Sequence, residues 1–595
     1  MRCLLHNTIL LILLNSISGS IYANVSYNNI PSAYQPSVWH RVFQKINEKR
    51  EFLPIIYNER EVSGSIIGDA VCLICDAVFT ALLTERSFDM TKIQLEAQVE
   101  YYCADFLKIE EQDVCAGVIG LNMDPILYIL DKKATVTSTE VCSMLLGCTQ
   151  GSEAFEWKID IPAGETVKKV ESDGKQTFKI AHITDIHYDP DYTEGKPADC
   201  GKPQCCQPDQ DNPANTSVSV CGYWTSEIHA DVSPKLLNNT LDEMNSKPLM
   251  DFEFVYFTGD LVSHRVWNTS QDYNRKTITY VLDVFAEKFK NKKVFPILGN
   301  HEAHPMNLYP PLNIPEDDLN QQWLFDVISE KWLHWLTDNE KETVKNGGYY
   351  TVSPKTGFRI IVLNNNVCQS ENWWNLYENK DPYGQLQWLV KVLQQAEKDK
   401  EIVHILSHIP TSACLKVWGR EYNRIIERFA NTIAAQFNGH THRDHFSIYY
   451  DSKNVSNNVV INGASLVTDG AYPNFKIYTV DSKGFDILDS EVYTFDLEKA
   501  NTNKKIDWYK LYSFQKDFGV ANLTHTEMDR LVKTMISDIK SKNYTLINKY
   551  HDFYYRGSKI GKNVNCDSKC QNKYLCDMLT TVERQTTMCE KYLTF

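Results

Sequence analysis

The sequence lacks the features that mark several large protein classes. It has no basic stripe: 61 Lys and Arg residues stand against 76 Asp and Glu residues, which gives a net charge of −15 at pH 7. Nucleic-acid-binding proteins need clustered positive charge to meet phosphates, so we expect no nucleic-acid partner. Internal repeats and low-complexity stretches are also missing, so neither a repeat architecture nor a biased-composition tail is expected.

Long apolar runs are scarce as well. Residues 1–23 hold a single Arg near the start, the run TILLILL and small residues at Ser18, Ser20 and Ala23, which is typical of a cleaved secretory signal. This run is too short to span a bilayer, and we find no other candidate span in the sequence. We therefore expect a secreted and/or lysosomal protein.

Cysteine, by contrast, is plentiful. Of seventeen cysteines, Cys3 leaves with the signal, so an even sixteen remain, which favours disulfides throughout a secreted chain. Sequons for N-glycans point to the same compartment. They lie at Asn24, Asn215, Asn238, Asn268, Asn454, Asn522 and Asn543.

Metal-binding residue types occur in five ordered blocks in the middle of the chain. Each block follows an apolar, β-branched run, as FKIAHIT precedes DIHYD and FEFVYFT precedes GDLVSH, so we expect the blocks where buried strands end. Loops at strand ends carry the chemistry of many α/β enzymes. The candidate metal ligands are Asp185, His187, Asp260, Asn300, His408, His440 and His442.

The spacing within the blocks predicts that these side chains converge. Side chains at i and i+2 of an extended segment point the same way. Asp185 and His187 should therefore face one side, and so should His440 and His442. Asp260 has two carboxylate oxygens and is the candidate bridge between two ions about 3.5–4 Å apart. A glycine directly before three of the ligands permits tight turns and close backbone approach. Oxygen and imidazole ligands suit zinc, manganese or iron alike.

A lone DxH or GNH motif is weak evidence, because single histidines are more often hydrogen-bonded structural residues. All five blocks in order resemble the calcineurin-like metallophosphoesterase signature, DxH, GD, GNH[DE], H and GHxH, over about residues 175–480. The resemblance implies two ions that share Asp260. One ion would be held by Asp185, His187 and His442, and the other by Asn300, His408 and His440. The implied fold is two packed β-sheets flanked by helices, in agreement with helical stretches at 274–291 and 384–400.

Two such ions indicate hydrolysis of a phosphate ester by water, without a nucleophilic side chain. The leaving alkoxide still needs a proton. His301 in GNHE is our first candidate donor and His264 in GDLVSH the second, with a structural or surface role as the alternative for His264. The nearer family that the chain resembles, named below, implies that both histidines lie close to the scissile phosphate.

Residues 68–151 read as a separate helical module with six cysteines. Cys72 and Cys75 lie on one face of the first expected helix, so one segment can be stapled twice to another, although spacing alone leaves 15 connectivities. The pattern resembles a saposin domain. That resemblance implies the pairs Cys72–Cys148, Cys75–Cys142 and Cys103–Cys115, and it implies contact with lipid. A stapled helical cap that only packs against the enzyme is the alternative.

The two modules together resemble the acid sphingomyelinase family, as do LSHIP, AAQFNGHTHRDHF and the cysteine-bearing tail. The resemblance implies an enzyme with two Zn²⁺ per chain that cleaves sphingomyelin to ceramide and phosphocholine on a membrane or lipoprotein surface, docked through residues 68–151. INGASLVTDGAYPNFKIY departs from the family in detail and is expected to border the substrate. The implied pairs among the other cysteines are 200–205, 206–221, 368–414, 566–570 and 576–589. A zinc site is the alternative for Cys200–Cys221.

The remaining organisation completes an α+β chain, which we expect to be a monomer. We expect a lead segment at 24–67, a hinge-like linker at 152–174, the two-sheet catalytic domain at 175–499 and a helical, disulfide-rich region at 500–595. Candidates for a choline cage are Trp224, Trp267, Trp373 and Trp374, with packing as the commoner role. Two other functions stay open: a secreted nucleotide or general phosphodiesterase, and a non-catalytic lipid-binding or transfer protein.

Overall fold

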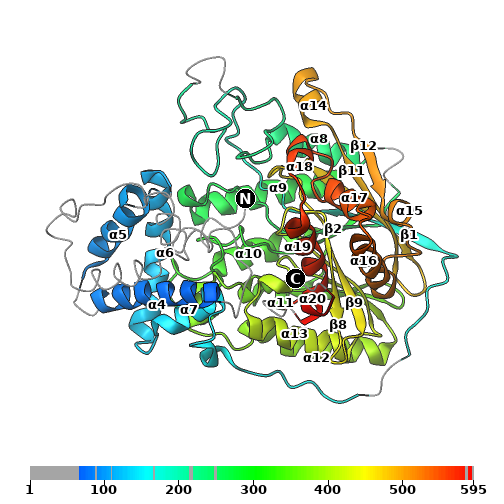
Figure 1. The fold of residues 1–595 in the computed structure, drawn as a ribbon, viewed down its shortest axis with the longest axis horizontal. Helices are drawn as coiled ribbons and strands as arrows, with labels where there is room; N and C mark the ends of the chain where they lie inside the picture. Colours follow the sequence, from blue (N-terminus) through cyan, green and yellow to red (C-terminus); the bar gives the residue numbers. More distant parts are fainter. Residues whose placement is uncertain are drawn as a thin grey trace.

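The computed structural model describes residues 66–86, 90–106, 108, 110–164, 168–212, 219–246, 251–582 and 587–592. The expected signal at 1–23, nearly all of the lead segment at 24–67, and the sequons Asn24 and Asn215 lie outside these residues. Figure 1 shows a small helical module, coloured blue, beside a larger unit that contains the strands.

Two six-stranded sheets form the larger unit (Figure 1). The first has the order β12-β11-β10-β1-β2-β3 and the second the order β4-β5-β6-β7-β9-β8. The strands of the first sheet are β1 (Thr177–Ile183), β2 (Phe254–Phe257), β3 (Lys293–Pro296), β10 (Asn474–Asp481), β11 (Ile487–Thr494) and β12 (Tyr509–Ser513). Those of the second are β4 (Tyr350–Lys355), β5 (Phe358–Val362), β6 (Ile402–Leu406), β7 (Ile433–Asn438), β8 (Phe446–Tyr450) and β9 (Ser456–Asn462).

The strands that lead to the metal-binding blocks are buried throughout or nearly so, because both faces of each sheet are covered. β1, β2 and β3 run parallel, as do β5, β6 and β7. Every residue of β2 and β6 is buried, as expected for parallel strands with continuous apolar runs. The predicted two-sheet architecture is therefore confirmed, and the strands fall where the apolar runs predicted them.

Helices flank the sheets. They are α8 (Pro234–Met244), α9 (Gln271–Lys288), α10 (Gln322–Lys331), α11 (Asp338–Lys345), α12 (Gln385–Asp399) and α13 (Lys416–Arg428). α9 and α12 confirm the helices predicted at 274–291 and 384–400. α9 begins early because the Ser270 side chain accepts a hydrogen bond from the Tyr273 backbone N–H and caps it.

The helical module consists of α4 (Ile66–Arg86), α5 (Lys92–Glu100), the π-helix η5 (Tyr101–Phe106), α6 (Gln112–Lys132) and α7 (Ser138–Leu146). Its three disulfides are the predicted ones. The expectation of no further candidate span needs correction: within the described residues, α6 is long and apolar enough to cross a membrane. This match is by length and composition only, and 44% of its apolar stretch is buried inside the protein.

The module and the segment after it lie directly against the catalytic unit. A side chain at Gly117 of α6 would meet the Trp267 carbonyl oxygen, so α6 and the short helix η7 (Val266–Asn268) are in backbone contact. In the expected linker at 152–174, the backbone N–H of Ile159 donates to Glu421 of α13 at 3.0 Å. This hydrogen bond ties residue 159 of the expected linker to α13.

The C-terminal helices pack on both sheets, with α15 on β11 and β12 of the first and α16 and α19 on the second. They are α14 (Leu497–Asn503), α15 (Phe514–Phe518), α16 (His525–Lys540), α17 (Thr545–Tyr554), α18 (Lys559–Asn563), α19 (Ser568–Leu579) and α20 (Thr587–Tyr592). α16 packs on β8 and β9, and α19 packs on β8 (Figure 1). β12 lies beyond the boundary expected at 499/500 and pairs with β11 at the edge of the first sheet.

All five remaining disulfides also match the predicted pairs: 200–205, 206–221, 368–414, 566–570 and 576–589. The alternative of a zinc site in Cys200–Cys221 is therefore wrong, because all four of its sulfurs are used in disulfides.

Candidate metal centre

The seven candidate ligands lie in loops that follow five parallel strands. β1 leads to Asp185 and His187, β2 to Asp260, β3 to Asn300, β6 to His408, and β7 to His440 and His442. His440 is partly buried and the other six are buried. The structure gathers them from both sheets into one cluster, which the sheet topology makes possible because parallel strands end at the same edge.

The backbone at these positions is not extended, so the reason given for convergence within the blocks was wrong. Asp185 and His187 have φ values of 49° and 46°, and His440 and His442 have values of 73° and 55°. The left-handed region is uncommon for residues other than glycine and costs on the order of 1–3 kcal/mol at each site. The loops therefore bring these side chains together through a strained turn and not through the alternation of a strand.

The glycines of the blocks serve close packing. A side chain at Gly299 would lie 2.1 Å from an Asp260 carboxylate oxygen, and one at Gly439 would lie 2.4 Å from an Asp185 carboxylate oxygen. Gly259 has φ of +91° and faces the backbone of Gly299. The predicted close backbone approach is therefore present. At Gly299 and Gly439 the backbone packs against the side chains of the candidate ligands Asp260 and Asp185.

The first donor group contains Asp185, His187, Asp260 and His442, whose ligand atoms all lie within 4.8 Å of one another. His187 Nε2 lies 3.1 Å from His442 Nε2 and 3.4 Å from Asp260 Oδ2. Because His187 Nδ1 donates to the Val262 carbonyl at 2.9 Å, its Nε2 presents a lone pair to this group. His442 Nε2 in turn lies 3.4 Å from Asp185 Oδ1.

The second donor group contains Asp260, His408 and His440. His408 Nδ1 donates to the Thr258 carbonyl at 2.6 Å, so its Nε2 also presents a lone pair. That nitrogen lies 3.1 Å from Asp260 Oδ2 and 3.0 Å from Asn300 Oδ1. His440 Nδ1 lies 2.9 Å from the same Asn300 oxygen.

These contacts bring lone pairs together without enough protons between them, which is the arrangement that a cation stabilises. Burial lowers the pKa of His408, but the Asp260 carboxylate outweighs it and raises that pKa to about 9, so in the absence of an ion a proton is drawn in. Imidazole nitrogens and carboxylate and amide oxygens suit divalent transition metals. The residues thus fit a dinuclear metal centre in which Asp260 belongs to both donor groups.

Further polar residues hold the ligands in place. Glu302, the last residue of GNHE, accepts hydrogen bonds from the backbone N–H groups of Asp260 and Gly299 at 3.3 and 2.6 Å, and so ties two ligand loops together. The Asn300 amide donates to Asn307 Oδ1 at 2.8 Å, which turns its own oxygen toward His408. Such partners orient the ligands and contribute to metal affinity.

The two candidate proton donors lie against this cluster. The ring of His187 stacks on His264 with centroids 3.8 Å apart and meets His301 edge-on at 4.6 Å. His264 is buried, not a surface residue, and Asp231 accepts from both its backbone N–H and its Nδ1 at 2.6 Å. Burial is the main cause that lowers the pKa of His264 to about 3 and that of His301 to about 4.

Some residues around the centre were not identified from sequence. Asp231 lies near the end of the disulfide-rich segment after β1, and no motif marks it. Asp469, whose Oδ2 lies 3.6 Å from His442 Nδ1, belongs to the stretch INGASLVTDGAYPNFKIY that we expected to border the substrate. The four candidate tryptophans are all buried packing residues. They are Trp224, Trp267, Trp373 and Trp374.

Comparisons with known proteins agree with this geometry. Residues 178–444 match the family model described as Calcineurin-like phosphoesterase, and residues 447–592 match the Acid sphingomyelin phosphodiesterase C-terminal region. A sphingomyelin phosphodiesterase from Homo sapiens is 32% identical over 90% of this chain and 85% of its own. Sphingomyelin phosphodiesterase B from Dictyostelium discoideum is 32% identical over 80% of this chain and 75% of its own. A cyclic GMP-AMP phosphodiesterase from Rattus norvegicus is 26% identical over 67% of this chain and 88% of its own.

Proposed function

Because this chain belongs to the acid sphingomyelin phosphodiesterase family, we propose that it hydrolyses sphingomyelin to ceramide and phosphocholine. The observation that carries the proposal is the pair of donor groups that share Asp260 at the ends of five parallel strands. The complete donor set argues against a non-catalytic lipid-binding or transfer protein.

We further propose that the ions are two Zn²⁺, one held by Asp185, His187 and His442 and one by Asn300, His408 and His440, with Asp260 shared. Imidazole makes up much of the donor set, which favours zinc over the hard cations that prefer oxygen alone. When bound, such ions polarise the phosphoryl group and lower the pKa of a water.

The chain's own residues then have two tasks. The Glu302 carboxylate, which accepts from the Asp260 backbone N–H, and Asn307 Oδ1, which accepts from the Asn300 amide, hold the donor groups in place. His301, and second His264, donates a proton to the leaving oxygen of ceramide. Both imidazoles are neutral in the free protein because burial lowers their pKa, and the negative phosphodiester raises it again when it binds beside them. Asp231 holds His264 by Nδ1 and leaves its Nε2 for this role.

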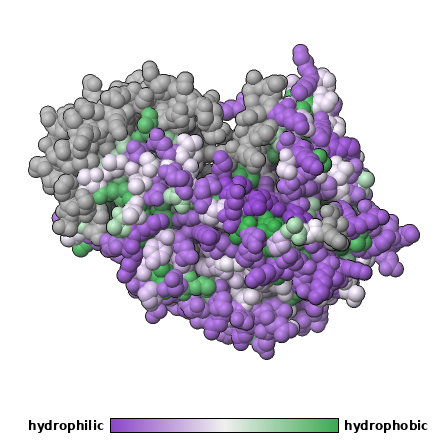
Figure 2. Space-filling view, turned by 90° about the horizontal axis from the view of Figure 1, so that it is seen from below, coloured by the Kyte–Doolittle hydropathy of each residue, from purple (hydrophilic) through white to green (hydrophobic). Residues whose placement is uncertain are grey.

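Lipid contact is assigned to the helical module at residues 68–151. Leu73 in α4 and Ile93 in α5 are apolar yet 45% and 76% exposed. On the face in Figure 2, hydrophilic residues predominate and hydrophobic ones form small separate groups. Exposed apolar side chains on amphipathic helices suit the surface of a membrane or lipoprotein. The contact of α6 with η7 places this module next to the loop that carries His264.

Compartment, glycans and oligomeric state complete the proposal. Eight disulfides suit an oxidising environment, so we assign the protein to the lysosome or the extracellular space, as a glycosylated monomer. Among the predicted sequons, Asn268, Asn454 and Asn543 are exposed and accessible to a glycan.

A second candidate is a nucleotide or general phosphodiesterase, which the similarity to the cyclic GMP-AMP phosphodiesterase favours. One experiment separates the two. The purified protein is incubated at pH 5 and pH 7 with sphingomyelin in detergent, and in parallel with ATP and bis(p-nitrophenyl) phosphate, and the products are identified by mass spectrometry. Phosphocholine released faster than nucleotide products supports the sphingomyelin proposal, whereas faster nucleotide cleavage overturns it.

A further inference from the structure

The C-terminal helices send one arginine to the backbone of the metal-site loop. Arg556 lies in the turn between α17 and α18, where it has a left-handed φ of 52°, and its side chain is completely buried. Its Nη1 donates to the His442 carbonyl at 2.9 Å and its Nη2 donates to Ser465 Oγ at 3.0 Å. Its Nε donates to the Tyr472 carbonyl.

These acceptors belong to two different loops. His442 lies in the loop after β7, whereas Ser465 and Tyr472 lie in the loop between β9 and β10 that also carries Asp469. Asp469 Oδ2 lies 3.6 Å from His442 Nδ1, on the side of the ring that faces away from the donor group. Arg556 thus cross-links the backbone of a proposed ligand to the loop that carries the carboxylate behind that ligand.

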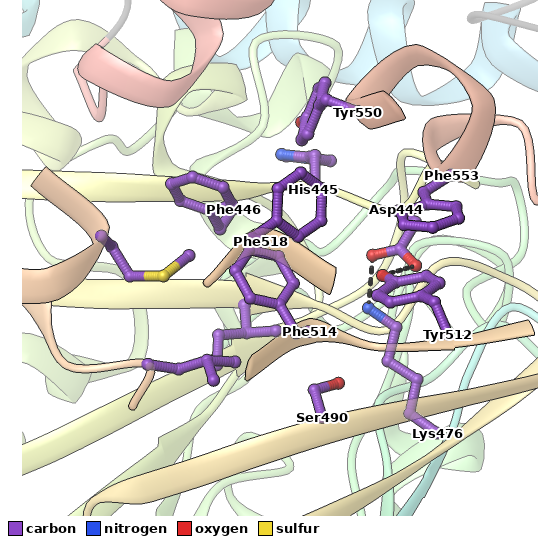
Figure 3. Close-up of a pocket in the computed structure, with 13 residues that line it drawn as sticks. Asp444, His445, Phe446, Lys476, Ser490, Tyr512, Phe514, Phe518, Tyr550 and Phe553 are labelled. Atoms are coloured by element: carbon purple, nitrogen blue, oxygen red, sulfur yellow. Dashed lines mark hydrogen bonds and ion pairs between the residues drawn. The ribbon is translucent and has the colours of Figure 1, made fainter. Parts of the chain in front are cut away.

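The next residues of the His442 loop are anchored as well. Asp444 Oδ1 accepts from the buried Lys476 ammonium at 2.6 Å, and its Oδ2 accepts from the Tyr512 hydroxyl at 2.6 Å (Figure 3). These groups line a cavity whose other walls are mostly aromatic and aliphatic, between the sheets' ends and the C-terminal helices (Figure 3). Because its Lys, Asp and Tyr groups are bonded to one another, we assign this cavity to anchoring and not to a ligand.

The chemistry of the contact requires arginine. A guanidinium presents its N–H donors in a rigid planar fork, which lets one side chain reach three acceptors on two loops. A lysine ammonium in its place is a point charge on a flexible stem and would reach one loop at a time.

We propose that Arg556 is a positioning residue for the metal centre: it sets His442 against Asp469 so that the His442 ring presents Nε2 to the first donor group. The inference rests on the proposed role of His442 as a metal ligand. It assigns to the C-terminal region a part in zinc binding, in addition to its packing on the two sheets.

The test compares Arg556→Lys and Arg556→Met with a matched control, Arg530→Met, in the full-length protein. Arg530 lies in α16 of the same region, is exposed, and pairs with Glu527. For each protein we measure zinc content after dialysis and the melting temperature with zinc and with chelator, without substrate. A ligand that binds the folded state raises the melting temperature according to its affinity, so this rise reports zinc binding separately from fold stability.

We expect both Arg556 variants to retain fewer zinc ions than the wild type and to show a smaller zinc-dependent rise, with zinc affinity about 10–100-fold weaker at one site. Arg530→Met should keep the wild-type rise. If the Arg556 variants melt lower but keep the full zinc-dependent rise, Arg556 is only structural and the inference is overturned. If Arg556→Met does not fold, Arg556→Lys, which keeps the charge, provides the same comparison. If the wild type binds no zinc, the proposed metal centre itself is overturned. This result is seen before any variant is compared.

Discussion

Two pairs of buried histidines come from the same strands, yet their ring nitrogens are bonded differently. His182 in β1 and His404 in β6 have a protein partner on both nitrogens. For His404 these are the Tyr256 hydroxyl at 2.8 Å and the Phe485 carbonyl at 2.7 Å. His187 and His408, a few residues further along, each donate to one backbone carbonyl, and their Nε2 atoms face other lone pairs.

The difference shows that burial alone does not distinguish the proposed metal ligands from core histidines. All four histidines are buried, and burial alone favours the neutral ring. Burial lowers the pKa of His404 to about 4, whereas Asp260 raises the pKa of His408 to about 9. The pairs differ in what faces Nε2: in His187 and His408 this nitrogen faces other acceptor atoms, with no proton donor opposite it. Each of the following predictions changes one side of that comparison.

The largest effect is expected from Asp260→Asn. An amide has one oxygen and an NH₂ group where the carboxylate has two oxygens, so it cannot serve both donor groups. We expect the loss of at least one zinc ion and a fall in kcat/KM of at least about 1000-fold, which corresponds to several kcal/mol of transition-state stabilisation. Zinc analysis and steady-state kinetics measure both. The core variant His404→Gln should keep its zinc, and an Asp260→Asn enzyme with two zinc ions and ordinary activity would contradict the shared-ligand role.

The next effect is expected from His301→Gln. Loss of a proton donor should lower kcat on sphingomyelin by roughly 10²–10⁴-fold, because the ceramide alkoxide is a poor leaving group. The loss should be much smaller on bis(p-nitrophenyl) phosphate, whose leaving group needs no proton. Zinc content should be unchanged. Equal losses on both substrates would show that His301 acts in some way other than proton donation. The loss of kcat in His264→Gln, measured in parallel, shows which of the two histidines contributes more to proton donation.

The lowered pKa of the core histidine His404 predicts that the stability of the fold depends on pH. The pKa of His404 is about 4 in the folded protein and 6.5 ordinarily, so between these values the unfolded chain binds a proton that the folded chain does not. Stability is therefore lost as pH falls from 6.5 to 4, by up to about 3 kcal/mol from this residue. Urea unfolding across pH 4–7 should show that His404→Gln has a shallower loss than the wild type. Identical slopes would refute the assignment.

The smallest effect is expected when a side chain that contacts a histidine ring is changed. Asp469→Asn removes the charge behind His442 and should weaken zinc binding about 10–100-fold. The matched change in the core is Tyr478→Phe, which removes the hydroxyl 3.0 Å from His182 Nδ1 and should leave zinc affinity unchanged. Competition with a chromogenic chelator measures both variants. If the two changes affect zinc binding alike, the distinction between site and core histidines fails.

The clustering of the candidate ligands could be predicted from sequence because each signal is local: a candidate such as Asp260 or His408 directly follows an apolar strand run. The sheets followed from the same runs. Asp231, Asp469 and Arg556 could not be found this way, since their roles depend on how separate loops meet in space. The spacing of Asp185 and the other paired ligands predicted convergence for the wrong reason, because a positive φ is set by tertiary contacts and leaves no trace in an alternating pattern.

The most direct measurement is anomalous diffraction at the zinc edge from crystals of the protein grown with zinc. We expect two peaks about 3.5–4 Å apart, with Asp260 between them, His187 and His442 beside one, and His408 and Asn300 beside the other. A single peak away from Asp260, or no peak at all among these residues, would contradict this expectation.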